Sequence, residues 1–154
     1  MPSTASRTHT SEEAVKSLAA DAPKNLTVHF DGKKTTEIKS TGAKISQENL
    51  AVHVSYTPGY EEGRLLGIPK MGDGKGNTIK DAVVKAVTDH QLQDNVVALC
   101  FDTTAANTGK RKGAAVLIEE ELNCKCAYFG CRHHVSELIC GGIYQTTLYV
   151  SYFA

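Results

Sequence analysis

The chain has 154 residues, enough for one domain with a substantial hydrophobic core. Its 17 Lys and Arg residues balance its 17 Asp and Glu residues, so any contact with a polyanion must come from a local patch of positive charge. No apolar run of about 18 residues predicts a membrane span, and the N-terminus lacks the apolar core of a signal peptide. We therefore expect an intracellular protein without a membrane partner.

The first half of the chain predicts three strands. Residues 1–22 are rich in Ser, Thr, Ala and charge, and we expect them to form a flexible leader before a fold that begins at residue 23. Residues 25–38 alternate apolar and polar side chains, residues 49–56 repeat that period of two, and residues 63–71 form a third short apolar run. Because short loops join these segments, they predict an antiparallel meander.

Residues 76–94 have the pattern of an amphipathic helix. Asn77 or Thr78 is expected to cap its N-terminus through a side-chain hydrogen bond, and Asp81 stands where an acidic variant of the capping box requires it. The apolar face of the predicted helix consists of Ile79, Ala82, Val83, Ala86, Val87 and His90.

The second half alternates strands and helices. Residues 95–101 are almost continuously apolar, which is typical of a strand covered on both faces, and we expect this strand at the centre of the sheet. Residues 114–122 predict a second helix, residues 124–131 a further strand and residues 132–140 a third helix. The order of elements predicts an α/β fold with a mixed β-sheet and helices packed on it.

Two aspartates each follow an apolar run. Asp31 follows "LTVHF" and Asp102 follows "VVALCF", and the first and fourth strands are expected to lie side by side and parallel, so that these ends meet. Two carboxylates there would bind one or two divalent ions, Mg²⁺ or Mn²⁺, of the kind that assist phosphodiester chemistry. The alternative is that each Asp only caps a turn, and for either residue alone that alternative is favoured.

The loop after Asp102 is glycine-containing and basic. It fails as a phosphate-binding loop, because Thr104 stands where that motif needs its first glycine and Arg111 where it needs a hydroxyl. Lys110, Arg111 and Lys112 are candidates for neutralising DNA phosphates beside a metal site. Exposed basic residues in a solvated loop remain the alternative.

Thiols and imidazoles gather near the C-terminus, and these are the ligand types that Zn²⁺ prefers. The pattern has no second matched pair of ligands, so reduced thiols in the core or in a cleft are favoured over a zinc site, which stays open as an alternative. The cluster consists of Cys124, Cys126, Cys131, His133, His134 and Cys140.

The motifs "CFDTTAANTG" and "GCRHHVSEL" resemble the catalytic region of hAT-type DNA transposases. In that family the second catalytic Asp opens a segment with a nearby Asn, as Asp102 and Asn107 do here. A C-x-x-H motif that leads into an apolar helix follows, and Cys131 and His134 match it. Asp31 in "VHFDGK" matches the first catalytic Asp of the family.

The resemblance covers residues 24–141 and implies a ribonuclease H-like fold with Asp31 and Asp102 as catalytic, metal-binding residues. It also implies a structural or supporting role for Asn107, Cys131 and His134, DNA as the partner and a nuclear location. The third catalytic residue of the family, a Glu far downstream, has no counterpart, so we expect an incomplete core over residues 23–141, little activity alone and a divergent tail over 142–154. The alternatives are a non-catalytic module that binds DNA or protein, and a small zinc-binding domain.

Overall fold

The computed structural model describes residues 23–38, 42–56, 60–132, 134–136 and 138–140. Six strands form one mixed sheet in which β3, β2, β1, β5 and β6 are neighbours in that order and β4 pairs with β2. The predicted leader and tail lie outside the described residues. The strands are β1 (Leu26–Ile38), β2 (Lys44–Tyr56), β3 (Tyr60–Gly67), β4 (Lys70–Met71), β5 (Val96–Phe101) and β6 (Ala127–Gly130). The helices are α2 (Gly76–Asp89), the 3-10 turn η1 (Gln93–Asn95), α3 (Ala105–Thr108) and α4 (Ala114–Leu122).

The predicted α/β class is confirmed, and so are the predicted meander and the parallel pairing of the first and fourth predicted strands. β1, β2 and β3 form an antiparallel meander, and β5 returns to lie parallel to β1 on its other side. β6 then adds in parallel to β5. This strand order is compatible with a ribonuclease H-like fold.

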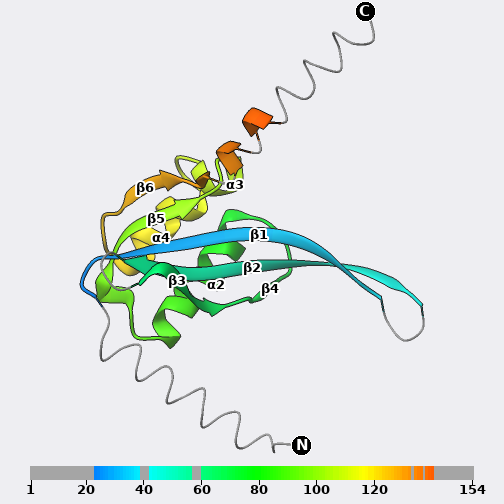
Figure 1. Ribbon diagram of the computed structural model, residues 1–154, viewed down its shortest axis with the longest axis horizontal. Helices are drawn as coiled ribbons and strands as arrows, with labels where there is room; N and C mark the ends of the chain where they lie inside the picture. Colours follow the sequence, from blue (N-terminus) through cyan, green and yellow to red (C-terminus); the bar gives the residue numbers. More distant parts are fainter. Residues whose placement is uncertain (1–22, 39–41, 57–59, 133, 137, 141–154) are drawn as a thin grey trace, which may run out of the picture.

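The core lies on the face of the sheet that α2 and α4 cover, as Figure 1 shows. On this face, Val28 and Phe30 of β1 lie beside Leu99 and Phe101 of β5, because alternate side chains of a strand point to the same face. The phenyl rings of Phe30 and Phe101 stack with their centroids 5.3 Å apart. The C-terminal part of β1 and the N-terminal part of β2 form a two-stranded ribbon that runs beyond the helices (Figure 1).

The first helix begins at the predicted residue, but its predicted cap and its predicted end were wrong. α2 begins at Gly76 after Lys75, and neither Asn77 nor Thr78 caps it. Instead, the hydroxyl of Thr78 donates a 2.6 Å hydrogen bond to Asp73 Oδ1, which also accepts the backbone N–H of Lys75, so an aspartate turn precedes the helix. The helix ends at Asp89 rather than running to residue 94, since Gln91 adopts a left-handed backbone conformation with φ of 57°.

Three predicted strands also differ in extent or place. β5 is not the central strand: β1 occupies the middle of the sheet, and Val97 of β5 is 41% exposed. Pro69 separates β3 from the short β4, because proline has no N–H to donate to the ladder. The last strand covers only residues 127–130 of the predicted 124–131. The helix expected over 132–140 is present at the residues described there.

Three glycines allow close packing where α2, α3 and α4 meet. A Cβ on Gly76 would collide with the carbonyl oxygen of Lys112, and one on Gly113 would collide with the backbone N of Gly109. The loop between α3 and α4 is tied by a 2.8 Å hydrogen bond from Gly113 N to Gly109 O. This packing holds the segment after Asp102 in place. Within the described residues, no helix is long and apolar enough to cross a membrane.

Candidate functional site

Asp102 lies directly after β5 and organises the turn into α3. Its Oδ1 accepts three hydrogen bonds: from Thr104 N at 3.0 Å, from Thr104 Oγ1 at 2.7 Å and from Asn107 Nδ2 at 2.6 Å. Burial alone would raise the pKa of Asp102, but these hydrogen bonds and the charge of His134 outweigh it and lower the pKa. The carboxylate is therefore ionised at neutral pH, with Oδ2 accepting no hydrogen bond from any described residue.

Asn107 is the buried polar residue of this site. It is only 6% exposed, its Nδ2 is committed to Asp102, and its Oδ1 is buried without a hydrogen-bond donor. A buried acceptor without a donor is costly, by about 1–3 kcal/mol. An oxygen of this kind beside an ionised carboxylate suits a hard cation such as Mg²⁺ or Mn²⁺.

Asp31 is not at the end of a strand, contrary to the prediction; it lies in the middle of β1, which continues to Ile38. The last residues paired between β1 and β5 are His29 and Cys100. Asp31 follows His29 by two residues, and Asp102 follows Cys100 by two residues. Asp31 and Asp102 therefore stand at the same level of adjacent strands. Their side chains line different cavities, however.

The two cavities lie on opposite faces of β1. Asp102 and Asn107 line a cavity of about 280 Å³ together with Gly32 of β1. Asp31 lines one of about 480 Å³ with His29 on the face that α2 and α4 leave open. Successive residues of a strand point to opposite faces, so Asp31 and Gly32 must diverge in this way.

The C-x-x-H residues lie beside both aspartates. The backbone N–H of Cys131 donates a 2.8 Å hydrogen bond to the carbonyl of Phe101, and Cys131 lines the same cavity as Asp31. His134 lies close enough for its charge to favour the ionised form of Asp102. Asn107 and His134 thus lie near Asp102, and Cys131 lies near Asp31.

The thiols and imidazoles near the C-terminus, for which zinc binding was the alternative, do not form one cluster among the described residues. The sulfur atoms of Cys124 and Cys126 are 3.4 Å apart, and burial together with Cys124 raises the pKa of Cys126, which favours the neutral thiol. His133 lies outside the described residues. In the part of the chain that is described, no three His, Cys, Asp or Glu side chains are placed to hold a metal ion, and all five cysteines are free thiols.

Lys110, Arg111 and Lys112 are exposed on the turn between α3 and α4. None forms a salt bridge with a described residue. They lie on the segment that follows Asn107 and the short helix α3, so three positive charges without an ion pair among the described residues stand within ten residues of Asp102 in the sequence.

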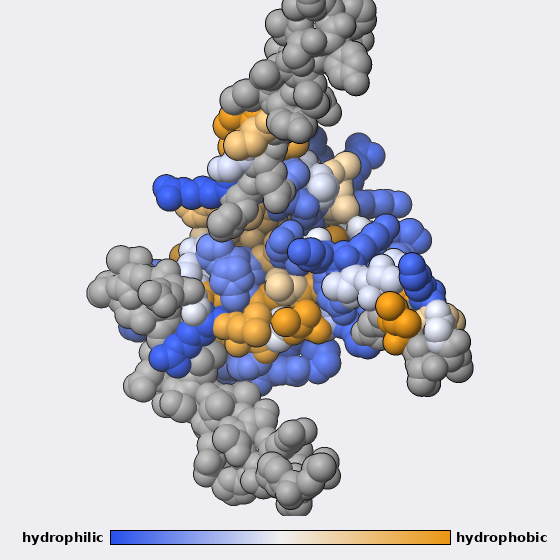
Figure 2. All heavy atoms as spheres, turned by 45° about the vertical axis from the view of Figure 1, so that its right-hand side comes forward, coloured by the Kyte–Doolittle hydropathy of each residue, from blue (hydrophilic) through white to orange (hydrophobic). Residues whose placement is uncertain are grey.

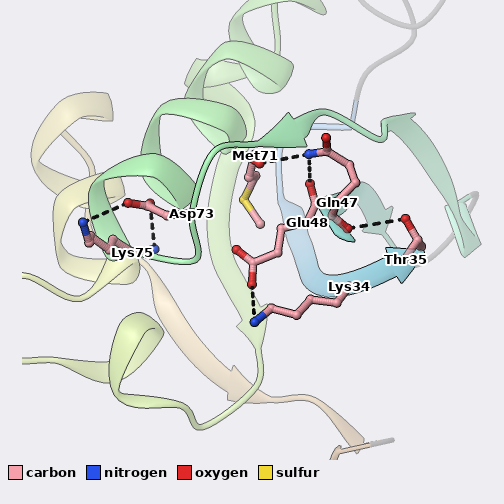
Figure 3. Close-up of polar contacts among 7 residues, drawn as sticks. All are labelled: Lys34, Thr35, Gln47, Glu48, Met71, Asp73 and Lys75. Atoms are coloured by element: carbon pink, nitrogen blue, oxygen red, sulfur yellow. Dashed lines mark hydrogen bonds and ion pairs between the residues drawn. The ribbon is translucent and has the colours of Figure 1, made fainter. Parts of the chain in front are cut away.

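Glu48 of β2 is a carboxylate near Asp102 that the sequence patterns did not identify. It lines the same cavity as Asp102 and Asn107, its side chain is 24% exposed, and its Oε1 lies 3.4 Å from Nζ of Lys34 (Figure 3). One signal was available: Glu48 continues the inward-facing row of Leu50 and Val52 at a period of two. A charged residue in an inward-facing row is unusual and indicates a polar site within the fold.

No protein-family model matches the chain, and no curated protein sequence matches it either.

On the open face of the sheet, His29 and His53 form a stacked pair. They are cross-strand neighbours with ring centroids 4.4 Å apart, and His29 Nε2 lies 2.6 Å from Ser55 Oγ. Burial and the neighbouring His53 lower the pKa of His29 from 6.5 to about 4, and burial lowers the pKa of His53. Asp31 and Arg132 line the same cavity with opposite charges.

Acidification is expected to destabilise the protein through this pair. Because the folded state holds His29 neutral, the unfolded chain binds more protons between pH 6.5 and about 4, so stability falls as the pH falls through that window. After discounting for solvent exposure, the loss is about 1–2 kcal/mol. Urea unfolding at pH 7.5 and pH 5 measures it, and the double variant His29→Gln, His53→Gln should flatten the difference. An unchanged pH dependence in that variant would contradict the assignment.

Proposed function

We propose that this domain is a transposase-type, ribonuclease H-like module whose site holds a divalent cation, Mg²⁺ or Mn²⁺, next to bound DNA. The supporting observation is the parallel pairing of β1 with β5, which brings Asp31 and Asp102 to the same level of neighbouring strands. The match of Asp102, Asn107, Cys131 and His134 to hAT-type motifs adds the family to the proposal.

The residues at the site fit such a cation. The carboxylate of Asp102 would hold it beside Asn107 Oδ1, a buried oxygen that lacks a donor. Asp31 stands at the same level of the neighbouring strand but lines the cavity on the open face. When bound, a divalent cation positions an attacking oxygen and stabilises the leaving oxygen of a phosphodiester. Thr104 and the amide of Asn107 hold the carboxylate of Asp102 in one orientation, so the negative charge is fixed before any ligand arrives.

DNA phosphates would contact the exposed turn beside the site. Lys110, Arg111 and Lys112 lack internal partners among the described residues, so their charges are available to phosphate oxygens. Contacts of this type position DNA without reading its sequence.

Calorimetric titration with Mn²⁺ tests the proposal. Asp102→Asn is expected to weaken binding at least about a hundredfold, since it removes the central charged ligand. Glu121→Gln, on the far surface of α4, serves as the control and should bind as the wild type does. Absence of Mn²⁺ binding by the wild type at millimolar concentration would refute the metal-dependent function.

A non-catalytic interaction module is the second candidate. β6 and the residues that follow it expose a group of large apolar side chains. Figure 2 shows apolar side chains next to the grey atoms at the upper end of the molecule. Exposed apolar groups of this size favour a protein contact. This candidate takes the lead if no divalent cation binds. The group consists of Tyr128, Phe129, Val135, Leu138 and Ile139.

A further inference from the structure

We propose that Glu48 is an acidic ligand of the divalent cation at Asp102, with Asn107 Oδ1 as a neutral oxygen ligand. This inference rests on the proposed function in taking a divalent cation as the ligand. It adds a second carboxylate, that of Glu48, which lines the same cavity as Asp102, whereas Asp31 lines the cavity on the open face. It makes the cavity of about 280 Å³ the binding cavity.

The sheet itself explains why this cavity exists. Along the inner face of β1, Val28 and Phe30 are buried in the core, and the next inward-facing residue is Gly32, which has no side chain. A Cβ on Gly32 would meet only the tips of the Met71 and Leu50 side chains, at 3.7 and 3.9 Å. The space beyond Phe30 therefore stays open below β1.

Glu48 enters this space from β2. In the register of β1 and β2 it stands opposite Lys34, two residues beyond the Gly32–Leu50 pair. Its neighbour across the cavity wall is Gly74, where a Cβ would lie 3.3 Å from Oε2. Gly74 thus leaves the carboxylate the room that any larger residue would take.

Asn107 supplies the independent sign of a missing ligand. Asn107 is one of the residues that line the cavity, it is nine-tenths buried, and its Oδ1 has no donor among the described residues. Nδ2 of the same side chain donates a hydrogen bond to Asp102, so a flip of the amide that exchanged Oδ1 and Nδ2 would lose that hydrogen bond. An oxygen ligand set of two carboxylates and one amide is what Mg²⁺ and Mn²⁺ take.

Lys34 acts as the counter-ion in the absence of the cation. Figure 3 shows its ammonium reaching towards Glu48, with Nζ 3.4 Å from Oε1. The side chain of Lys34 is 73% exposed, so the ammonium can turn into solvent when a divalent cation takes over the charge of Glu48. The cation and Lys34 therefore compete for one carboxylate.

The experiment is Mn²⁺ titration of the full chain by calorimetry, with the thermal shift on adding Mn²⁺ as a second readout. Glu48→Gln keeps the size of the side chain and should weaken binding at least about tenfold, while Asp31→Asn should change it by less than about twofold. Lys34→Gln should tighten binding by about threefold, because a competing charge is removed. Melting without metal confirms that each variant is folded.

The outcomes separate this inference from the proposed function. Loss of binding in Glu48→Gln and Asp102→Asn, with binding kept in Asp31→Asn, supports it. Loss in Asp31→Asn and Asp102→Asn, with binding kept in Glu48→Gln, overturns it and leaves the proposed function standing. Failure of the wild type to bind Mn²⁺ overturns both.

Discussion

Replacing Gly113 by alanine is expected to destabilise the protein by about 3 kcal/mol or more. The new Cβ would collide with the backbone N of Gly109 and would lie 2.5 Å from the carbonyl oxygen of Gly109 and 2.7 Å from that of Asn107. These neighbours are backbone atoms, so no side chain can turn away to make room. The loop between α3 and α4 would have to move, and Asn107 with it.

Urea unfolding measures this loss, and Gly72→Ala is the matched control. A Cβ on Gly72 would meet no atom within 4 Å, and its backbone does not adopt a positive φ, so stability should stay within about 0.5 kcal/mol of the wild type. Equal stabilities for the two variants would show that the close approach at Gly113 is not required by the fold.

The second large effect is expected for Phe101→Ala, with a loss of about 3–5 kcal/mol. Phe101 is 4% exposed, stacks on Phe30 and meets the ring of Tyr128 edge-on with centroids 5.6 Å apart. Its removal leaves a cavity between β1 and β5, directly before Asp102. The site should therefore lose its shape together with the core.

Phe129→Ala provides the comparison within the neighbouring strand β6. Phe129 is 53% exposed, so truncation should cost no more than about 0.5 kcal/mol. Thermal unfolding of both variants at one protein concentration measures the contrast. Similar losses for Phe101 and Phe129 would mean that the ring stack contributes little to stability.

The sequence was most informative where one face of an element is buried. Leu26, Val28 and Phe30 alternate with polar residues and do form β1, and Val83 and Val87 lie on the buried face of α2. Burial on one face leaves a periodic trace in the sequence, so strands and helices of this kind are predictable. The parallel pairing of the first predicted strand with the fourth, which is β5 in the structure, followed from the order of elements.

The missed features lack such a trace. Residues 44–48 of β2 are polar apart from the exposed Ile45 and have no buried side chain, so no alternation marked them and Glu48 was not assigned to a strand. The end of α2 depends on the left-handed backbone conformation of Gln91, and a glutamine in the sequence does not predict that conformation. The place of Asp31 within β1 depends on pairing with β2, which continues through charged residues to Ile38.

The candidate site was predictable in its motif residues and not in its cavity. Asp102 precedes the short helix α3 and Asn107 lies in it, five residues on, and the structure joins them by a hydrogen bond. The separation of Asp31 and Glu48 onto opposite faces follows from side-chain alternation in a sheet whose register is visible only in three dimensions.

The pairing of β1 with β5 also bears on the order in which the chain folds. β1, β2 and β3 are joined by short connections, so the meander assembles from local contacts, whereas β5 must return from Val96 to Leu26 across all the elements between them. Contacts between distant parts of the chain form late, since they carry the larger loop-closure entropy. The cavity of about 280 Å³ is lined by Gly32 and Glu48 from the meander and by Asp102 after β5, so a partly folded chain carries the meander before this cavity is complete.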